Sequence, residues 1–143
     1  MLYKNLEFIS CCFFFVVLYN KYKGCDYMLK SKTKDEINIV TSKVVDELLK
    51  QLSENVYKII LYGSYARGDF TNESDIDIMV LLNCDKDNVA LYRKQTSRIA
   101  SRVSLENDVE VSLLLRDKNT FENNSRVLPF YNNIQKEGIA LYG

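Results

Sequence analysis

Two short apolar segments, separated by only a dozen residues, constrain the fold of this chain more than any other feature. Residues 56–62 (VYKIILY) are rich in β-branched and aromatic side chains, and residues 75–82 (DIDIMVLL) are mostly apolar. Both patterns are typical of β-strands. The connection 63–74 is shorter than the helical crossover that joins parallel strands, so the two strands are predicted to be antiparallel neighbours.

Further elements are predicted on both sides of this strand pair. Thr33-Lys34-Asp35-Glu36 has the form of a capping box, and apolar side chains then recur at helical spacing to about Ser53. The remaining patterns predict a helix over 85–105, a strand over 108–115, helices over 117–124 and 127–137, and a short strand over 139–142. Because the third strand follows a full helix, the order predicts an α/β fold with a mixed β-sheet flanked by helices.

Composition excludes several kinds of site. The chain has 143 residues and no histidine, which excludes histidine bases, Ser-His-Asp triads and histidine-bound zinc. Lys and Arg number 19, as do Asp and Glu, so the formal net charge is zero and there is no strong nucleic-acid signal. The four cysteines form no C-x-x-C pair, so we expect reduced thiols in a cytoplasmic protein.

The first 27 residues differ in composition from the rest. Residues 8–19 (FISCCFFFVVLY) are apolar but fall short of the about 20 residues that a membrane-spanning helix needs, so no stable membrane span is expected. Two interpretations stay open: a peripheral or signal-like segment, and an upstream extension that precedes a natural start at Met28 and is not part of the native protein. A single folded domain is expected over residues 28–143.

Candidate functional residues gather where the first two strands meet. Gly63 ends the first strand and lets backbone approach a ligand closely, and Ser64 opens a predicted helical turn whose amides favour anions. Asp75 and Asp77 are two residues apart on a strand, so their carboxylates point to the same face. Two such carboxylates repel each other unless a cation lies between them, and Mg²⁺ is the natural hard cation.

The third predicted strand offers a third acid, with two candidates. Asp108 and Glu110 alternate with apolar residues, and strand alternation places both on one face without choosing between them. A phosphate cradle with three acids indicates phosphoryl or nucleotidyl transfer assisted by two Mg²⁺ ions. For Arg67, contact with a phosphate and simple pairing with Asp69 or Glu73 are equally open.

The spacing of these residues resembles a known signature. Gly63-Ser64, ten residues and then Asp75-x-Asp77 match the pattern of the DNA polymerase β-like nucleotidyltransferase superfamily. The fuller stretch over 63–78 (GSYARGDFTNESDIDI) is similar to its minimal nucleotidyltransferases, the MNT antitoxins encoded beside HEPN toxins. The resemblance implies a polymerase β-like nucleotidyltransferase fold over residues 28–143. It also implies nucleotide contacts from Gly63, Ser64 and Arg67, and catalytic metal ligands at Asp75, Asp77 and Glu110.

The function that the resemblance implies is a protein adenylyltransferase, which moves AMP from ATP to a tyrosine of a partner HEPN toxin. Two other functions stay open: a small-molecule nucleotidyltransferase of the aminoglycoside-modifying type, and a non-catalytic module that binds a toxin or a nucleotide. The chain ends at Gly143 without a second helical domain to shape an acceptor site. We therefore expect a partner to complete that site.

Overall fold

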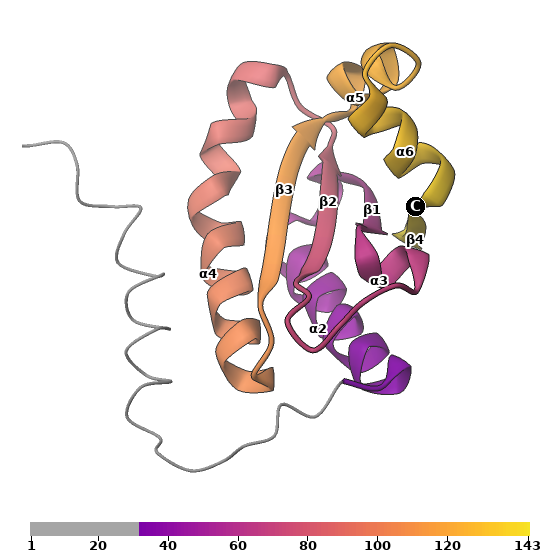
Figure 1. Ribbon diagram of the computed structural model, residues 1–143. Helices are drawn as coiled ribbons and strands as arrows, with labels where there is room; N and C mark the ends of the chain where they lie inside the picture. The colour runs from indigo at the N-terminus through magenta and orange to yellow at the C-terminus, as the bar shows by residue number, and fades with distance from the viewer. Residues whose placement is uncertain (1–31) are drawn as a thin grey trace, which may run out of the picture. The chain divides into compact units, whose positions relative to one another are not determined.

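The computed structural model describes residues 32–143, so the expectations for residues 1–27 and for a start at Met28 lie outside the described residues. Within them, four strands form one sheet in the order β3-β2-β1-β4 (Figure 1). The strands are β1 (Val56–Tyr62), β2 (Ile76–Leu82), β3 (Val111–Asp117) and β4 (Ile139–Tyr142).

The sheet is mixed, as predicted. Strand β1 runs antiparallel to both β2 and β4, whereas β2 and β3 are parallel. In the register of the sheet, Asp77 pairs with Tyr62 on one side and with Ser112 on the other. The end of β1 and the beginnings of β2 and β3 therefore meet at the same end of the sheet.

Helices α2 (Lys34–Leu52) and α4 (Val89–Asn107) pack on one face of the sheet (Figure 1). The predicted capping box is present at the start of α2, where the Thr33 hydroxyl accepts from the amide of Glu36. The two helices are also joined by an ion pair of 2.6 Å between Arg102 and Glu47. None of the helices within residues 32–143 has the length and apolar character that crossing a bilayer requires.

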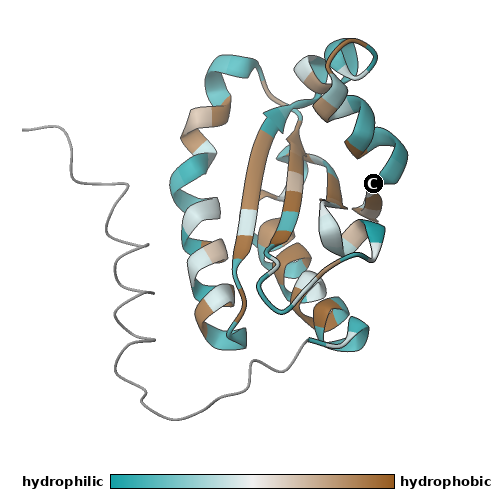
Figure 2. Ribbon diagram, viewed as in Figure 1, coloured by the Kyte–Doolittle hydropathy of each residue, from teal (hydrophilic) through white to brown (hydrophobic). Residues whose placement is uncertain are grey.

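Short helices cover part of the opposite face. Helices α5 (Lys118–Asn124) and α6 (Pro129–Glu137) pack on β1 and β2 through a smaller core, and Pro129 lies in the first turn of α6 as predicted. That core consists of Ile60, Met79, Leu81, Phe121, Tyr131 and Ile134. Figure 2 shows that β2 and β3 are mostly hydrophobic, with a hydrophilic break near their beginnings. Asp77 lies on this face, below the smaller core, because it alternates with the buried Ile76 and Ile78.

One element boundary differs from the prediction in a way that matters for the site. The third strand begins at Val111, not at Asp108. Asp108 instead ends α4 in the left-handed conformation, with φ 50° and ψ 49°. Aspartate tolerates this conformation better than most residues, so the chain turns there before the strand starts. The expectation that Asp108 and Glu110 share a strand face was therefore wrong.

Three shorter elements complete the description. The helical turn predicted after Gly63 is present as α3 (Ser64–Arg67). Two 3₁₀ turns flank the sheet, η1 (Ser53–Asn55) before β1 and η2 (Lys86–Asn88) before α4. Because η2 takes up the residues after β2, α4 starts a few residues later than the sequence pattern predicted.

Candidate active site

The backbone corner after β1 has room only for glycine. Gly63 has φ +77°, a conformation that L side chains rarely adopt. A Cβ added there would also lie 2.5 Å from Oδ2 of Asp77. The carboxylate of Asp77 therefore lies directly against the backbone of Gly63, and residues that are fourteen positions apart in sequence form one corner.

The turn α3 holds Ser64 at this corner. Tyr65 is buried and stacks on Phe70 with ring centroids 4.5 Å apart, which fixes α3 to the core, and Gly68 ends the turn with φ +83°. The amides of Arg67 and Gly68 bond to the carbonyls of Gly63 and Ser64, respectively. The first amides of the turn and the half-exposed Ser64 hydroxyl are left to meet a ligand.

The three predicted acids, Asp75, Asp77 and Glu110, interact electrostatically. The amide of Ile76 donates to the carbonyl of Glu110 at 2.8 Å, so Glu110 lies beside the Asp75–Asp77 segment. Burial, and then the charge of Asp75, raise the pKa of Asp77 above its usual range. Burial and the charges of Asp75 and Asp77 likewise raise the pKa of Glu110. The carboxylates therefore repel one another when they are all ionised.

Mutual repulsion of this kind fits a cation site. A divalent cation would relieve the repulsion, and carboxylate oxygens are the ligands that Mg²⁺ prefers. No three acidic or cysteine side chains within residues 32–143 converge tightly enough to form a preassembled metal cluster. Asp75, Asp77 and Glu110 would thus have to close around a cation, with the phosphates of a nucleotide supplying further oxygens.

The structure separates the remaining candidates. Arg67 is exposed and pairs with Asp69, with Nε 3.2 Å from Oδ2, and its charge opposes the rise in the pKa of Asp77. Arg67 thus lies near the acids while pairing with a loop residue. Asp108 is exposed, in the turn that precedes β3. Glu110, the other candidate for the third acid, lies beside Ile76, and burial and the charges of Asp75 and Asp77 raise its pKa.

Two neighbours of the acids were not predicted as site residues. Ser112 pairs with Asp77 across β2 and β3 and is exposed on the same face. Tyr62 pairs with Asp77 from the other side, and burial together with the charge of Asp77 raises its pKa to about 12. Strand alternation could have indicated that Ser112 lies near the acids. The position of Tyr62 beside Asp77 depends on the register between β1 and β2, which the sequence pattern does not give.

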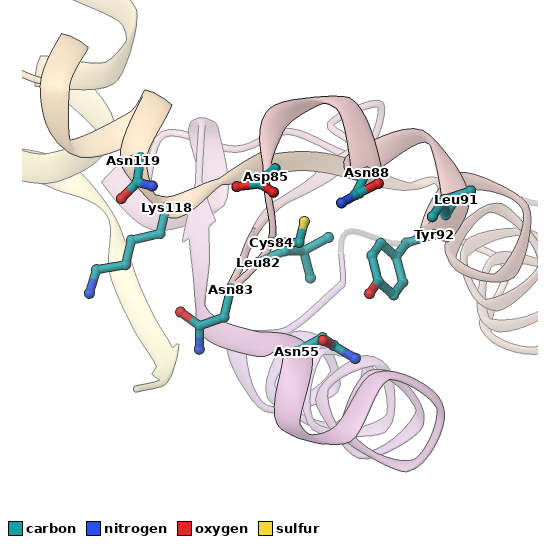
Figure 3. A pocket seen from close by; sticks show the side chains of 10 residues that line it. All are labelled: Asn55, Leu82, Asn83, Cys84, Asp85, Asn88, Leu91, Tyr92, Lys118 and Asn119. Carbon is teal, nitrogen blue, oxygen red and sulfur yellow. The ribbon is translucent and has the colours of Figure 1, made fainter.

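A hollow of about 600 Å³ lies at the other end of β2 (Figure 3). It is lined by residues that follow β2, such as Asn83 and Asp85, and by Lys118 from the start of α5. Cys84 also lines it, and burial with the charges of Asp117 and Asp85 raises the pKa of that thiol, which therefore stays protonated. None of the predicted site residues contributes to this hollow.

The sequence of this chain matches a protein family and is similar to two named proteins. Residues 42–141 match the family model described as "Nucleotidyltransferase domain". Two curated proteins of Methanocaldococcus jannaschii, both named "Putative protein adenylyltransferase", are similar to this chain. The first is 34% identical over 68% of this chain and 90% of its own length, and the second is 37% identical over 53% and 79%.

The fold is also found in a solved structure. The crystal structure of a protein from Sulfolobus solfataricus, titled a putative nucleotidyltransferase, superimposes with a TM-score of 0.54 and 22% identity. The superposition covers 80% of this chain and 91% of that one. The sheet and its helices thus have the arrangement of a nucleotidyltransferase fold.

Proposed function

We propose that this chain, which belongs to the nucleotidyltransferase domain family, transfers AMP from ATP to a tyrosine of a partner protein, and that this partner is a HEPN-type toxin. The names of the two curated relatives support protein adenylylation as the reaction. The motif over residues 63–78, which resembles that of antitoxins encoded beside HEPN toxins, supports the choice of partner.

The observation that carries the proposal is the contact between Asp77 and Gly63. It brings a carboxylate to the backbone corner that would receive a triphosphate. Burial and the charge of Asp75 disfavour the ionisation of that carboxylate. Gly63 and the amides of α3 would bind the phosphates, with the Ser64 hydroxyl as a further donor. Arg67, whose charge acts on Asp77, would exchange Asp69 for a phosphate when a nucleotide binds.

Two Mg²⁺ ions held by Asp75, Asp77 and Glu110 would supply charge neutralisation at the α-phosphate and the pyrophosphate. In the transfer, the phenolic oxygen of the acceptor forms a bond to the α-phosphorus. The bond from that phosphorus to the oxygen that bridges to the β-phosphate breaks, and pyrophosphate leaves. The acceptor hydroxyl gives up its proton, and Glu110, which lies beside the Asp75–Asp77 segment, would accept it.

Labelled ATP tests the proposal directly. The protein is incubated with Mg²⁺, ATP labelled at the α-phosphorus, and the product of the adjacent gene. We expect label on a tyrosine of that partner, and no label when ATP carries it at the γ-phosphorus. Label on an added aminoglycoside would instead indicate small-molecule transfer, and complex formation without any label would indicate a binding module.

A matched pair of variants assigns the site. Asp77→Ala should abolish transfer, whereas Asp85→Ala removes the same side chain at the other end of β2 and should leave transfer unchanged. Both variants should keep the far-ultraviolet circular dichroism of the wild type. Full activity of Asp77→Ala would refute the assignment of the acids.

A further inference from the structure

Three large apolar side chains are exposed close together after α5. Val127, Leu128 and Phe130 are 74%, 44% and 48% exposed, and they span the connection to α6 and the first turn of that helix. We refer to these three residues as the apolar rim. A contiguous group of exposed apolar side chains is typical of a surface that contacts another molecule.

The buried side chains that pack α6 on the sheet lie outside the rim. The side chains that bury α6 against the sheet are Tyr131 and Ile134. The hydroxyl of Tyr131 also accepts a hydrogen bond of 2.9 Å from Nε of Arg116 on β3. The rim residues precede or adjoin these anchors and keep about half or more of their surface in water. Phe130 also contacts the ring of Tyr131, but about half of its surface stays in water.

The rim is continuous with the candidate active site. The ring of Phe130 meets the ring of Tyr62 edge to face, with centroids 5.8 Å apart. Tyr62 in turn pairs with Asp77 across β1 and β2. One aromatic ring thus separates the rim from the carboxylate that lies against Gly63.

The acceptor must reach the acids across this surface. Asp75 and Glu110 are exposed, and neither the hollow of about 600 Å³ nor a second hollow of about 150 Å³ contains any of the three acids. Asp75 and Glu110 are therefore open to an incoming molecule from the solvent. A molecule that brings a tyrosine to Asp77 and Glu110 would extend over Tyr62 onto the neighbouring rim.

A positive charge beside the rim indicates which side chains the incoming molecule should carry. Arg126 directly precedes the rim and is exposed. None of the ion pairs found within residues 32–143 involves it. An acidic side chain on the incoming surface would pair with it, and would favour approach at the rim over approach at the three acids.

We propose that the apolar rim, together with Arg126, is the docking surface for the acceptor protein, and that it binds a segment with apolar side chains next to the acceptor tyrosine and an acidic residue opposite Arg126. This inference rests on the proposed function, since it names where the acceptor of that reaction binds. The contact belongs to a transient enzyme–substrate complex, so it should determine KM for the protein acceptor more than kcat.

Steady-state transfer of AMP to the adjacent-gene product tests the docking surface. The test variant carries Val127→Ser, Leu128→Ser and Phe130→Ser, and a second variant carries Arg126→Glu. For the triple variant we expect KM for the protein acceptor to rise roughly tenfold or more, because truncated apolar anchors dominate binding at interfaces. For Arg126→Glu we expect a smaller rise that high salt diminishes, since the charge lies at an exposed position.

Two controls separate docking from chemistry. Leu105→Ser changes an exposed leucine, 70% in water, on α4 at the other face of the sheet, and should leave KM unchanged. N-acetyltyrosinamide at high concentration is an acceptor without the apolar and acidic side chains that would bind the rim and Arg126. Its slow adenylylation should be the same for the wild type and both variants.

The outcomes distinguish this inference from the function on which it rests. If the wild type labels no protein, the proposed function fails. If the wild type labels its acceptor and the triple variant has the same KM, the docking surface is refuted and the function stands. A matching loss with N-acetyltyrosinamide also refutes docking, because it would show that the rim acts on the acids themselves.

Discussion

Gly63 carries two constraints in one residue, a positive φ and a carboxylate in contact with its Cα. A single substitution tests both. Alanine at position 63 has to adopt φ 77° and ψ −155°, a conformation almost confined to glycine that costs about 1–3 kcal/mol, and its methyl group has to displace the carboxylate of Asp77. Gly68 also has a positive φ, but nothing lies within 4 Å of an added Cβ. Gly63→Ala should therefore lower the free energy of unfolding in urea more than Gly68→Ala does.

A double variant isolates the steric part of this cost. Asp77→Ala removes the atom that the new methyl group would meet, so Gly63→Ala should be less destabilising in that background. Equal losses for Gly63→Ala and Gly68→Ala, with no coupling to Asp77, would show that the corner is not closed in the way described.

Removing the charge of Asp77 should stabilise the ligand-free protein. Its pKa is raised by burial and by Asp75, so the folded state holds the proton more tightly than the unfolded state does. The ionised carboxylate therefore lowers stability as pH rises above the ordinary aspartate pKa of about 3.9, and this penalty is complete above the raised pKa. Asp77→Asn should unfold at a higher urea concentration than the wild type at pH 7, with the difference shrinking toward pH 4.

The matched substitution is Asp85→Asn, at the far end of β2. This variant removes one carboxylate at the opposite end of the strand from Asp75 and Asp77, so it controls for the loss of a single charge. A wild type that is more stable than Asp77→Asn at pH 7 in the absence of nucleotide and metal would contradict the electrostatic account of the site.

At the scale of elements, the turn between α4 and β3 decides which acid belongs to the site. Asp108 adopts the left-handed conformation that glycine accepts without strain, so Asp108→Gly should keep or raise stability and leave AMP transfer at the wild-type rate. Glu110→Gln should lower the transfer rate by roughly a hundredfold or more, because it removes a charge that binds metal and accepts a proton. Initial rates of transfer from labelled ATP measure the effect of each substitution. A lower rate for Asp108→Gly together with an unchanged rate for Glu110→Gln would make Asp108 the third acid.

The same turn shows where sequence reasoning reached its limit. The capping box at Thr33, the strand that ends at Gly63 and Pro129 in the first turn of α6 were predictable, because each depends on neighbours in the chain. Alternation of apolar residues also continued through Asp108, and nothing in that pattern reveals a left-handed residue. The sequence therefore predicted strand 108–115 three residues too early and left Asp108 and Glu110 undecided.

At the scale of the whole molecule, the two faces of the sheet serve different purposes. Helices α2 and α4 pack on one face along the main core, whereas α5 and α6 pack on the other face beside the smaller core. Asp77 and Ser112, near the beginnings of β2 and β3, are polar residues on the face of the smaller core. The mixed topology followed from chain order, but the contact of Phe130 with Tyr62 is a tertiary contact over 68 residues that no local pattern encodes.

If the Gly63 corner and its carboxylates bind a metal-bound nucleotide, calorimetric titration with ATP will detect that binding. The wild type and Asp85→Asn should bind ATP in the presence of Mg²⁺ with equal affinity, and EDTA should weaken that binding in both. Asp77→Asn should lose the Mg²⁺-dependent part of the affinity. Binding of Mg²⁺-ATP to Asp77→Asn as tight as to the wild type would contradict the account.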